Sequence, residues 1–148
     1  LMTETLTMLE QMDRYTRLKR ETRTEDRATV MAALKACGIT KVVMRYDGYG
    51  DSGGVEECVV EGGQGQESLT TPIQTTLVNW SSGEKTIQMS PLRDVLETLT
   101  MQYVDVEHDG WENNEGGSGD VTFDPVADTI TVSHTENYIT HEDFVHTY

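Results

Sequence analysis

A short string around Ser52 has the residue types of a hydrolytic site. Residues 50–54 read Gly-Asp-Ser-Gly-Gly, the string that surrounds the nucleophilic serine of chymotrypsin-like proteases. That chemistry requires a histidine base and a buried aspartate that precede the serine in the chain. All four histidines follow Ser52: His108, His134, His141 and His146. We therefore interpret the string as a hairpin turn and not as a protease site.

A second stretch approaches a zinc-binding helix. Residues 141–146 read His-Glu-Asp-Phe-Val-His, with one residue more between the histidines than the H-E-x-x-H motif has. Histidines five apart point about 140° apart on a helix that turns about 100° per residue. In a strand they face opposite sides. The stretch is predicted to be a C-terminal tail without zinc.

Acids in two glycine-rich segments are the remaining candidates for chemistry. Residues 47–51 lack the alternating oxygen ligands of an EF-hand loop, and residues 116–120 place their aspartate one position early for a calcium nonapeptide. Should both segments lie at one end of a sheet, five acids would converge: Asp47, Asp51, Asp109, Glu112 and Asp120. A small metal-dependent hydrolase that uses these loops therefore stays open as an alternative.

The pattern of apolar residues predicts the elements that position these segments. Helices are expected at residues 3–22, 24–36 and 90–109, and strands at 40–46, 55–61, 75–80, 121–123 and 130–132. Thr24 has the type and place of an N-cap, but the sequence leaves open whether residues 3–36 form one helix or two. The order predicts an α+β fold, with an antiparallel sheet built from two hairpins and helices packed on one face.

Two of the helices have apolar stripes. In the first, five residues lie on roughly one side at helical spacing: Met8, Leu9, Met12, Tyr15 and Leu18. In the last, Ser90 is expected to cap the helix and Pro91 to take its first position. Its stripe is continuous and comprises Leu92, Val95, Leu96, Leu99, Tyr103 and Val106.

The charge is large and unevenly spread. The chain of 148 residues has a formal net charge of −15, and its length fits a single α+β domain over residues 1–148. Residues 1–45 have nine lysines and arginines against six acids, whereas residues 46–148 have two against twenty. Such a body repels phosphate, so we expect no direct binding of nucleic acid through it. The basic N-terminal helical segment, at about residues 1–23, is the exception.

Compartment and cofactors follow from composition. The N-terminus lacks a basic stretch leading into an apolar one, and no apolar run approaches the roughly 18 residues of a membrane span. Cys37 and Cys58 have no C-x-x-C spacing and suggest free thiols in a reducing compartment. The sequence therefore predicts a cytoplasmic protein with no cofactor and no membrane contact, and it leaves the oligomeric state open.

The strongest candidates for a binding site are acids of the loops and strands, together with one loop tryptophan. They are Asp47, Asp51, Glu56, Glu57, Trp111, Glu112, Glu115 and Asp120. A rival basic site comprises Arg14, Arg17, Arg20 and Arg23. His134 continues the apolar face of Ile130 and Val132, and we interpret it as a core or edge histidine.

Four segments together carry a family resemblance. They are Tyr-Asp-Gly-Tyr-Gly-Asp-Ser-Gly at 46–53, Gly-Trp-Glu-Asn-Asn at 110–114, Gly-Asp-Val-Thr-Phe-Asp at 119–124, and Asp-Thr-Ile-Thr-Val at 128–132 with His134. Over about residues 28–138 the chain resembles a small, acidic, mostly proteobacterial family catalogued only as a domain of unknown function. Families of this kind are often carried by mobile elements. The resemblance implies no activity and assigns no catalytic residue.

The function predicted from these features is that of a non-enzymatic acidic binding protein. Its partner is expected to be a protein with a basic surface. An inhibitor that occupies the nucleic-acid-binding groove of a host enzyme or defence complex, as anti-CRISPR and anti-restriction proteins do, is the favoured form. The metal-dependent hydrolase and an accessory protein of another role are the alternatives.

Overall fold

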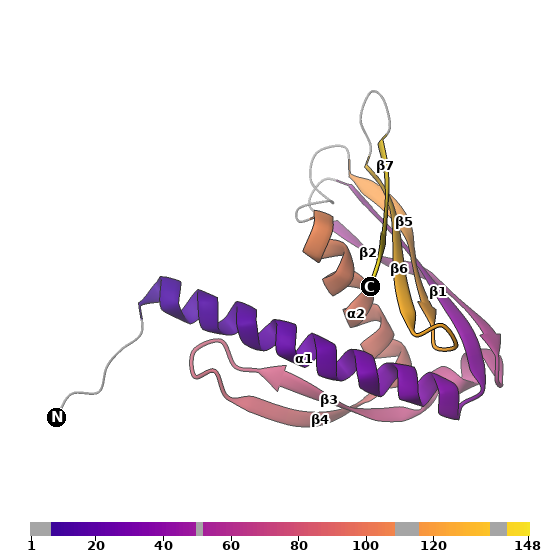
Figure 1. Ribbon diagram of the computed structural model, residues 1–148, viewed down its shortest axis with the longest axis horizontal. Helices are drawn as coiled ribbons and strands as arrows, with labels where there is room; N and C mark the ends of the chain where they lie inside the picture. Colours follow the sequence, from indigo (N-terminus) through magenta and orange to yellow (C-terminus); the bar gives the residue numbers. More distant parts are fainter. Residues whose placement is uncertain (1–6, 50–51, 109–115, 137–141) are drawn as a thin grey trace.

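The computed structural model describes residues 7–49, 52–108, 116–136 and 142–148, which form two helices, a five-stranded sheet and a separate hairpin (Figure 1). The elements are α1 (Met8–Ala36), β1 (Ile39–Tyr49), β2 (Ser52–Gly62), the 3-10 helix η1 (Gly65–Thr70), β3 (Pro72–Val78), β4 (Lys85–Pro91), α2 (Leu92–His108), β5 (Gly117–Asp124), β6 (Thr129–Glu136) and β7 (Glu142–Thr147). The prediction of an α+β fold with an antiparallel sheet is confirmed. α2 stands against one face of the large sheet, and α1 runs with the β3–β4 hairpin away from it (Figure 1).

α1 is a single helix of 29 residues, which answers the question that the sequence left open. Its N-cap is Thr7, whose Oγ1 accepts a hydrogen bond from the Glu10 N–H (3.1 Å). Thr24, the potential second N-cap, lies inside the helix, where its hydroxyl donates to the Arg20 carbonyl (3.1 Å). Such a bond lets a threonine sit within a helix. No glycine or proline lies between residues 3 and 37, and Gly38, with a φ of +75°, follows the helix as predicted.

The large sheet is antiparallel throughout and has the strand order β2-β1-β5-β6-β7. Both predicted hairpins are present, β1–β2 and β5–β6, and they join where β1 pairs with β5. The hairpin turn expected between the strands at 40–46 and 55–61 is wrong for most of its length, because β1 continues to Tyr49 and β2 starts at Ser52. Gly48 pairs with Gly53 on one side and Gly117 on the other, so these glycines belong to the ladder.

At two glycines of β5, atoms of neighbouring strands come too close to the backbone to leave room for a Cβ. A Cβ at Gly119 would lie 2.0 Å from the Ser133 carbonyl oxygen and 2.7 Å from the Tyr46 hydroxyl. A Cβ at Gly117 would lie 2.8 Å from the His134 ring. Glycine in a strand often marks such a close approach. The strand expected at 121–123 therefore begins earlier, at Gly117, within the glycine-rich segment.

The C-terminal segment, predicted to be a tail, forms the edge strand β7. It pairs with β6, with Phe144 opposite His134 and His146 opposite Val132. Beyond β7, Tyr148 and Ile130 exchange two backbone hydrogen bonds (2.7 and 3.0 Å). The sequence of β7 has no clear alternation of polar and apolar residues, so its own pattern gives no strand signal.

The core lies between the inner face of the sheet, α2 and the C-terminal half of α1, which contributes Val30 and Leu34. The strands contribute fully buried apolar side chains, among them Val42, Met44, Val121, Phe123, Ile130 and Val132. α2 contributes most of its predicted stripe, with Leu92, Leu96 and Leu99 at most 1% exposed. Val106, predicted for the same stripe, is 44% exposed, because it lines an open groove beside α1.

A separate hairpin, β3–β4, packs against α1. The prediction of one short strand at residues 75–80 is corrected to two paired strands. Ser90 and Pro91, predicted to start the last helix, end β4 instead, and α2 begins at Leu92. At the tip of the hairpin, Trp80 packs edge-on against Tyr15 of α1 (ring centroids 4.9 Å apart).

The first two turns of α1 do not bury their predicted stripe. Met8 and Leu9 are each 73% exposed and Met12 is 46% exposed. In Figure 1 this end of α1 lies far from the large sheet, beside the hairpin only. Helical periodicity alone cannot tell whether a partner for the stripe exists within the chain.

Candidate functional site

The outer face of the five-stranded sheet, opposite α2, has no second layer among the described residues (Figure 1). Side chains alternate between the two faces of a strand, so the neighbours of the buried core residues stand on this outer face. We call its six carboxylates the acidic face: Asp47 on β1, Glu57 and Glu61 on β2, Asp120 and Asp124 on β5, and Asp143 on β7. The cations Lys41 and Arg45 stand among them on β1.

The strand register fixes the spacing of these acids. Glu57, Arg45 and Asp120 are consecutive partners across β2, β1 and β5. Neighbouring strands lie about 4.8 Å apart, so the backbones of Glu57 and Asp120 are about 10 Å apart. Asp47 lies two residues beyond Arg45 on the same strand, which is about 7 Å. The acids are therefore spread over a broad surface and do not gather at one point.

Arg45 partly neutralises the centre of the acidic face. Its Nη1 lies 3.1 Å from Glu57 Oε2 and its Nε lies 3.4 Å from Asp120 Oδ1. All three side chains are about half exposed, so each pair contributes little to stability, of the order of 0–1 kcal/mol. The carboxylates remain accessible to a larger basic surface that replaces or supplements Arg45.

Two further acids of this face also serve the local fold. Asp47 Oδ1 accepts a hydrogen bond from the Gly48 N–H (2.8 Å). Asp124 Oδ1 accepts from the N–H groups of Val126 and Ala127 in the β5–β6 turn (3.0 and 2.9 Å). These bonds hold both carboxylates in place without neutralising their charge.

The structure brings together three of the predicted acids, namely Asp47, Glu57 and Asp120. Glu56 is exposed at the bulge where the β1–β2 register shifts between Arg45 and Tyr46. The other predicted members lie outside the described residues: Asp51, Trp111, Glu112 and Glu115.

Three acids of this face were missed by the sequence reasoning. Strand alternation could have found Glu61 and Asp124, because each neighbours a residue of the predicted strands. Asp143 required knowledge that the C-terminal segment is a strand, which its own sequence does not indicate.

On the inner face, His134 is buried, as predicted, and contacts Tyr46. The Tyr46 hydroxyl lies 2.5 Å from His134 Nδ1, and Glu136 Oε1 lies 4.0 Å from His134 Nε2. Burial, with a smaller contribution from the Asp120 charge, raises the pKa of Tyr46 well above its usual range. A phenol that keeps its proton is a hydrogen-bond donor, not a nucleophile, so this geometry supports a structural role for the pair.

A second surface is the groove between α1 and the C-terminal half of α2, which encloses about 720 Å³. We call it the basic groove. Its α1 wall presents Tyr15, Lys19, Arg20 and Arg23, and its α2 wall presents Gln102, Asp105 and Val106. The guanidinium of Arg23 lies 5.6 Å from the centre of the Tyr103 ring. The three cationic side chains of the α1 wall suit an acidic ligand.

The four arginines of the predicted rival site are not equivalent. Arg20 and Arg23 line the basic groove. Arg14 instead donates from Nη2 to the Ser81 carbonyl at the hairpin tip (2.8 Å). Arg17 is exposed and lines neither wall. The structure therefore divides this set and adds Lys19 to it.

The structure also bears on the predicted serine, cysteine, metal and membrane features. Ser52 opens β2, in a strand and not at the strand-to-helix turn of a nucleophile elbow. Cys58 is buried, and this burial raises the pKa of its thiol.

Among the described residues, no three His, Cys, Asp or Glu side chains group as metal ligands. No described helix has the length and apolar content needed to cross a membrane.

Comparison with known proteins gives a family but no activity. No curated protein and no solved structure matches the chain. A family model described as a family of unknown function, DUF6878, matches residues 22–148. The match extends beyond the predicted span of about residues 28–138 at both ends, and it begins within α1. The chain therefore belongs to the family of unknown function DUF6878.

Proposed function

We propose that this protein is a non-enzymatic binding protein whose acidic face docks on a basic partner protein. The observation that carries the proposal is an uncovered sheet face with carboxylates on four of its strands (Figure 1). We further propose that the partner surface is a nucleic-acid-binding groove, so that the protein acts as an inhibitor of anti-CRISPR or anti-restriction type.

Rigidity and spacing support this function. The acids of the sheet centre stand on a backbone fixed by ladder hydrogen bonds to both sides, so they lose little conformational freedom on binding. Carboxylates spaced at about 5–10 Å over a broad surface can oppose the lysines and arginines of a groove that tracks a phosphate backbone. A net charge of −15 also accelerates encounter with a basic partner.

The arrangement of the acids favours docking over catalysis. Asp47, Glu57 and Asp120 lie on one outer face, and two of them contact the same arginine. General acid–base chemistry needs two groups that converge on one reacting atom, with pKa values tuned by their surroundings. An extended contact surface needs the opposite, namely groups that remain apart.

The test is affinity capture with two variants of equal charge. Wild-type protein, an acidic-face triple variant (Asp47→Asn, Glu57→Gln, Asp120→Asn) and a control triple variant (Asp13→Asn, Glu67→Gln, Glu84→Gln) are used as bait in host lysate. The control acids are exposed and lie off the acidic face. We expect one basic protein to be retained by wild type and control and lost by the face variant. Equal retention by both triple variants would contradict the proposal.

Inhibition is tested on the recovered partner. The protein should displace nucleic acid from that partner, and its affinity should fall steeply with salt because exposed charges are screened over about 8 Å at 0.15 M. Fluorescence anisotropy should detect no binding of the protein itself to duplex DNA at this ionic strength. Affinity that does not change between 0.05 and 0.5 M salt would remove the electrostatic basis.

The basic groove supports a second candidate, the binding of an acidic partner protein. The specific observation is that Lys19, Arg20 and Arg23 line one open wall together. In the same capture experiment, Arg20→Gln with Arg23→Gln would lose the partner, whereas the acidic-face triple variant would retain it. Arg17→Gln with Lys35→Gln is the matched control, because both side chains are exposed outside the groove.

A further inference from the structure

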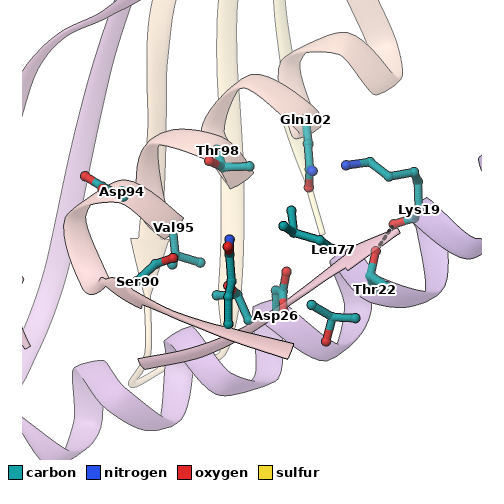
Figure 2. Close-up of a pocket in the computed structure, with 12 residues that line it drawn as sticks. Lys19, Thr22, Asp26, Leu77, Ser90, Asp94, Val95, Thr98 and Gln102 are labelled. Carbon is teal, nitrogen blue, oxygen red and sulfur yellow. Dashed lines mark hydrogen bonds between the residues drawn. The ribbon is translucent and has the colours of Figure 1, made fainter. Parts of the chain in front are cut away.

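A third feature is a polar pocket lined by α1, β3, β4 and α2. Its volume is about 250 Å³, and it lies apart from the acidic face (Figure 2). α1 forms the floor with Lys19, Thr22 and Asp26, and α2 forms the roof with Val95, Thr98 and Gln102 (Figure 2). At about 30 Å³ for each water molecule, this is room for about eight waters. The size suits a molecule as small as a free amino acid.

Hydroxyl, amide and charged groups dominate the walls. The hydroxyl side chains are Thr22, Thr75, Thr76, Ser90 and Thr98, and the amides are Gln88 and Gln102. Apolar contact comes from Leu77 and Val95. A ligand of this pocket therefore has several polar atoms and only a small apolar part.

Two polar atoms of the pocket have no hydrogen-bond partner among the described residues. Thr75 is only 6% exposed, and its Oγ1 is buried and unpaired. Gln102 Oε1 is buried and unpaired as well, and its side chain points down from α2 into the pocket in Figure 2. Buried side-chain polar atoms are nearly always hydrogen-bonded in folded proteins. The exceptions here face the same space, which points to a ligand that pairs with them.

Two carboxylates, Asp26 and the exposed Asp94, and one cation, Lys19, line the pocket; Asp26 and Lys19 do not pair directly. Asp26 and Lys19 are seven residues apart on α1, about 10 Å along the helix axis. Burial, with a smaller contribution from the Glu25 charge, raises the pKa of the Asp26 carboxyl, while a hydrogen bond from the Thr76 backbone and the Lys19 charge act in the opposite direction. Lys19 extends over the pocket mouth toward Gln102 (Figure 2). A half-buried carboxylate and a lysine at opposite ends of one small polar space favour a ligand with the complementary pair of charges.

We propose that this pocket binds a free α-amino acid, with the ligand ammonium facing Asp26 and Thr75 and the ligand carboxylate facing Lys19. The ammonium supplies the donors that the Asp26 carboxylate and the unpaired Thr75 Oγ1 accept. Gln102 lies beside Lys19, at the carboxylate end, where its side-chain amide donates to the ligand carboxylate. The small apolar part of the ligand contacts Val95 and Leu77. No covalent step is involved, and the site does not depend on the acidic face.

The experiment is titration of the full chain with each of the common amino acids, followed by calorimetry and by amide chemical-shift mapping. We expect at least one amino acid to bind with a Kd below 1 mM and to shift the amides of Thr75, Thr76 and Thr98. Ethanolamine has the amine without the carboxylate, and propionate has the carboxylate without the amine. Each should bind at least tenfold more weakly than the amino acid.

Variants on one helix separate binding from folding. Asp26→Asn and Lys19→Gln should each weaken binding at least tenfold, whereas Asp13→Asn and Lys35→Gln, the same chemical changes at exposed positions of α1, should not.

Asp26→Asn should stay folded, because an asparagine oxygen still accepts from the Thr76 N–H. A raised carboxyl pKa also means that the ionised form destabilises the folded state. Asp26→Asn should therefore raise the Tm at pH 7, and this gain should vanish as the pH falls below the carboxyl's usual value.

Three results would overturn the inference. The first is that no amino acid binds at 10 mM. The second is that Asp26→Asn binds as tightly as wild type. The third is that ethanolamine or propionate binds as tightly as the best amino acid, because one charged end would then suffice.

Discussion

Two β structures of this molecule contrast in how they are held. In the body, which comprises the five-stranded sheet and α2, inward side chains such as Met44 and Phe123 are fully buried. In the arm, which comprises residues 8–21 of α1 and the β3–β4 hairpin, Ile87 is 64% and Met89 is 62% exposed (Figure 1). Both are antiparallel ladders, but only the body has a large apolar core behind it.

The arm therefore depends on local polar and aromatic contacts between the hairpin and α1. They include the Arg14–Ser81 hydrogen bond, the Tyr15–Trp80 ring contact, and Lys85 near Glu21 (3.7 Å). Regions with few buried apolar contacts open at lower free energy than a core. The charges also differ, because the acidic face belongs to the body and the basic groove includes arm residues. The family match, which begins at residue 22, leaves the helical half of the arm outside it.

The largest contrast should appear in apolar truncations. Phe123→Ala removes a fully buried ring from the central strand of the body and should lower the free energy of unfolding by about 3–5 kcal/mol. Met12→Ala removes a 46% exposed side chain from the arm and should change it by about 0.5 kcal/mol or less. Urea unfolding followed by circular dichroism measures both. Equal losses would show that the arm has a core of its own.

Glycine substitutions should give the next largest contrast. Gly119→Ala places a Cβ 2.0 Å from the Ser133 carbonyl and should destabilise by about 1–3 kcal/mol or more. Gly83→Ala in the arm meets only the Arg14 side chain, so its cost is mainly that of a φ of +71°, about 1 kcal/mol. Gly54→Ala is the control, because nothing lies within 4 Å of its Cβ. Thermal unfolding should rank the three in this order, and a neutral Gly119→Ala would contradict the close packing of β5 and β6.

The same contrast explains what could be predicted from the sequence. The two hairpins of the body were predictable: Ile130 and Val132 alternate with threonines, and Val42, Met44 and Tyr46 fall on one face at a spacing of two. Their lengths were not, because Gly48 and Gly117 give a turn signal locally and become strand only by pairing with each other. Tertiary pairing overrides local preference here.

The acids of the acidic face could be predicted only where the strands that hold them were predicted. Asp47, Glu57 and Asp120 share one face, which follows from alternation once β1 pairs with β5. No sequence pattern reveals that Arg45 stands between Glu57 and Asp120, because this contact joins three strands. The polar pocket was equally hidden, since its walls come from four elements that meet only in the fold.

A smaller contrast concerns the arginines that connect α1 to each region. Arg27 donates to Asp128 Oδ1 and to the carbonyls of Asp128 and Tyr148 in the body (3.0, 2.8 and 3.3 Å). Arg27→Gln should therefore cost about 1–2 kcal/mol. Arg14→Gln loses one bond in the arm but also removes a buried Nε that is unpaired among the described residues, so it should cost about 0.5 kcal/mol or less. Unfolding in urea again measures both, and a larger effect of Arg14→Gln would reverse the proposed order of body and arm.

The smallest expected effect tests which region meets the partner. Arg45→Gln removes the cation at the centre of the acidic face and should cost less than about 1 kcal/mol, because its ion pairs are exposed. A unit charge about 10 Å from a partner charge in water is worth about 0.4 kcal/mol, so association with a basic partner should accelerate about twofold.

Arg93→Gln makes the same change in net charge, but Arg93 pairs with Glu97 on α2, away from the acidic face. Stopped-flow association at low salt with the partner recovered by capture should therefore be faster for Arg45→Gln than for Arg93→Gln. Equal rates would mean that only the total charge matters, and a slower Arg45→Gln would place the contact on cations, as the basic groove requires.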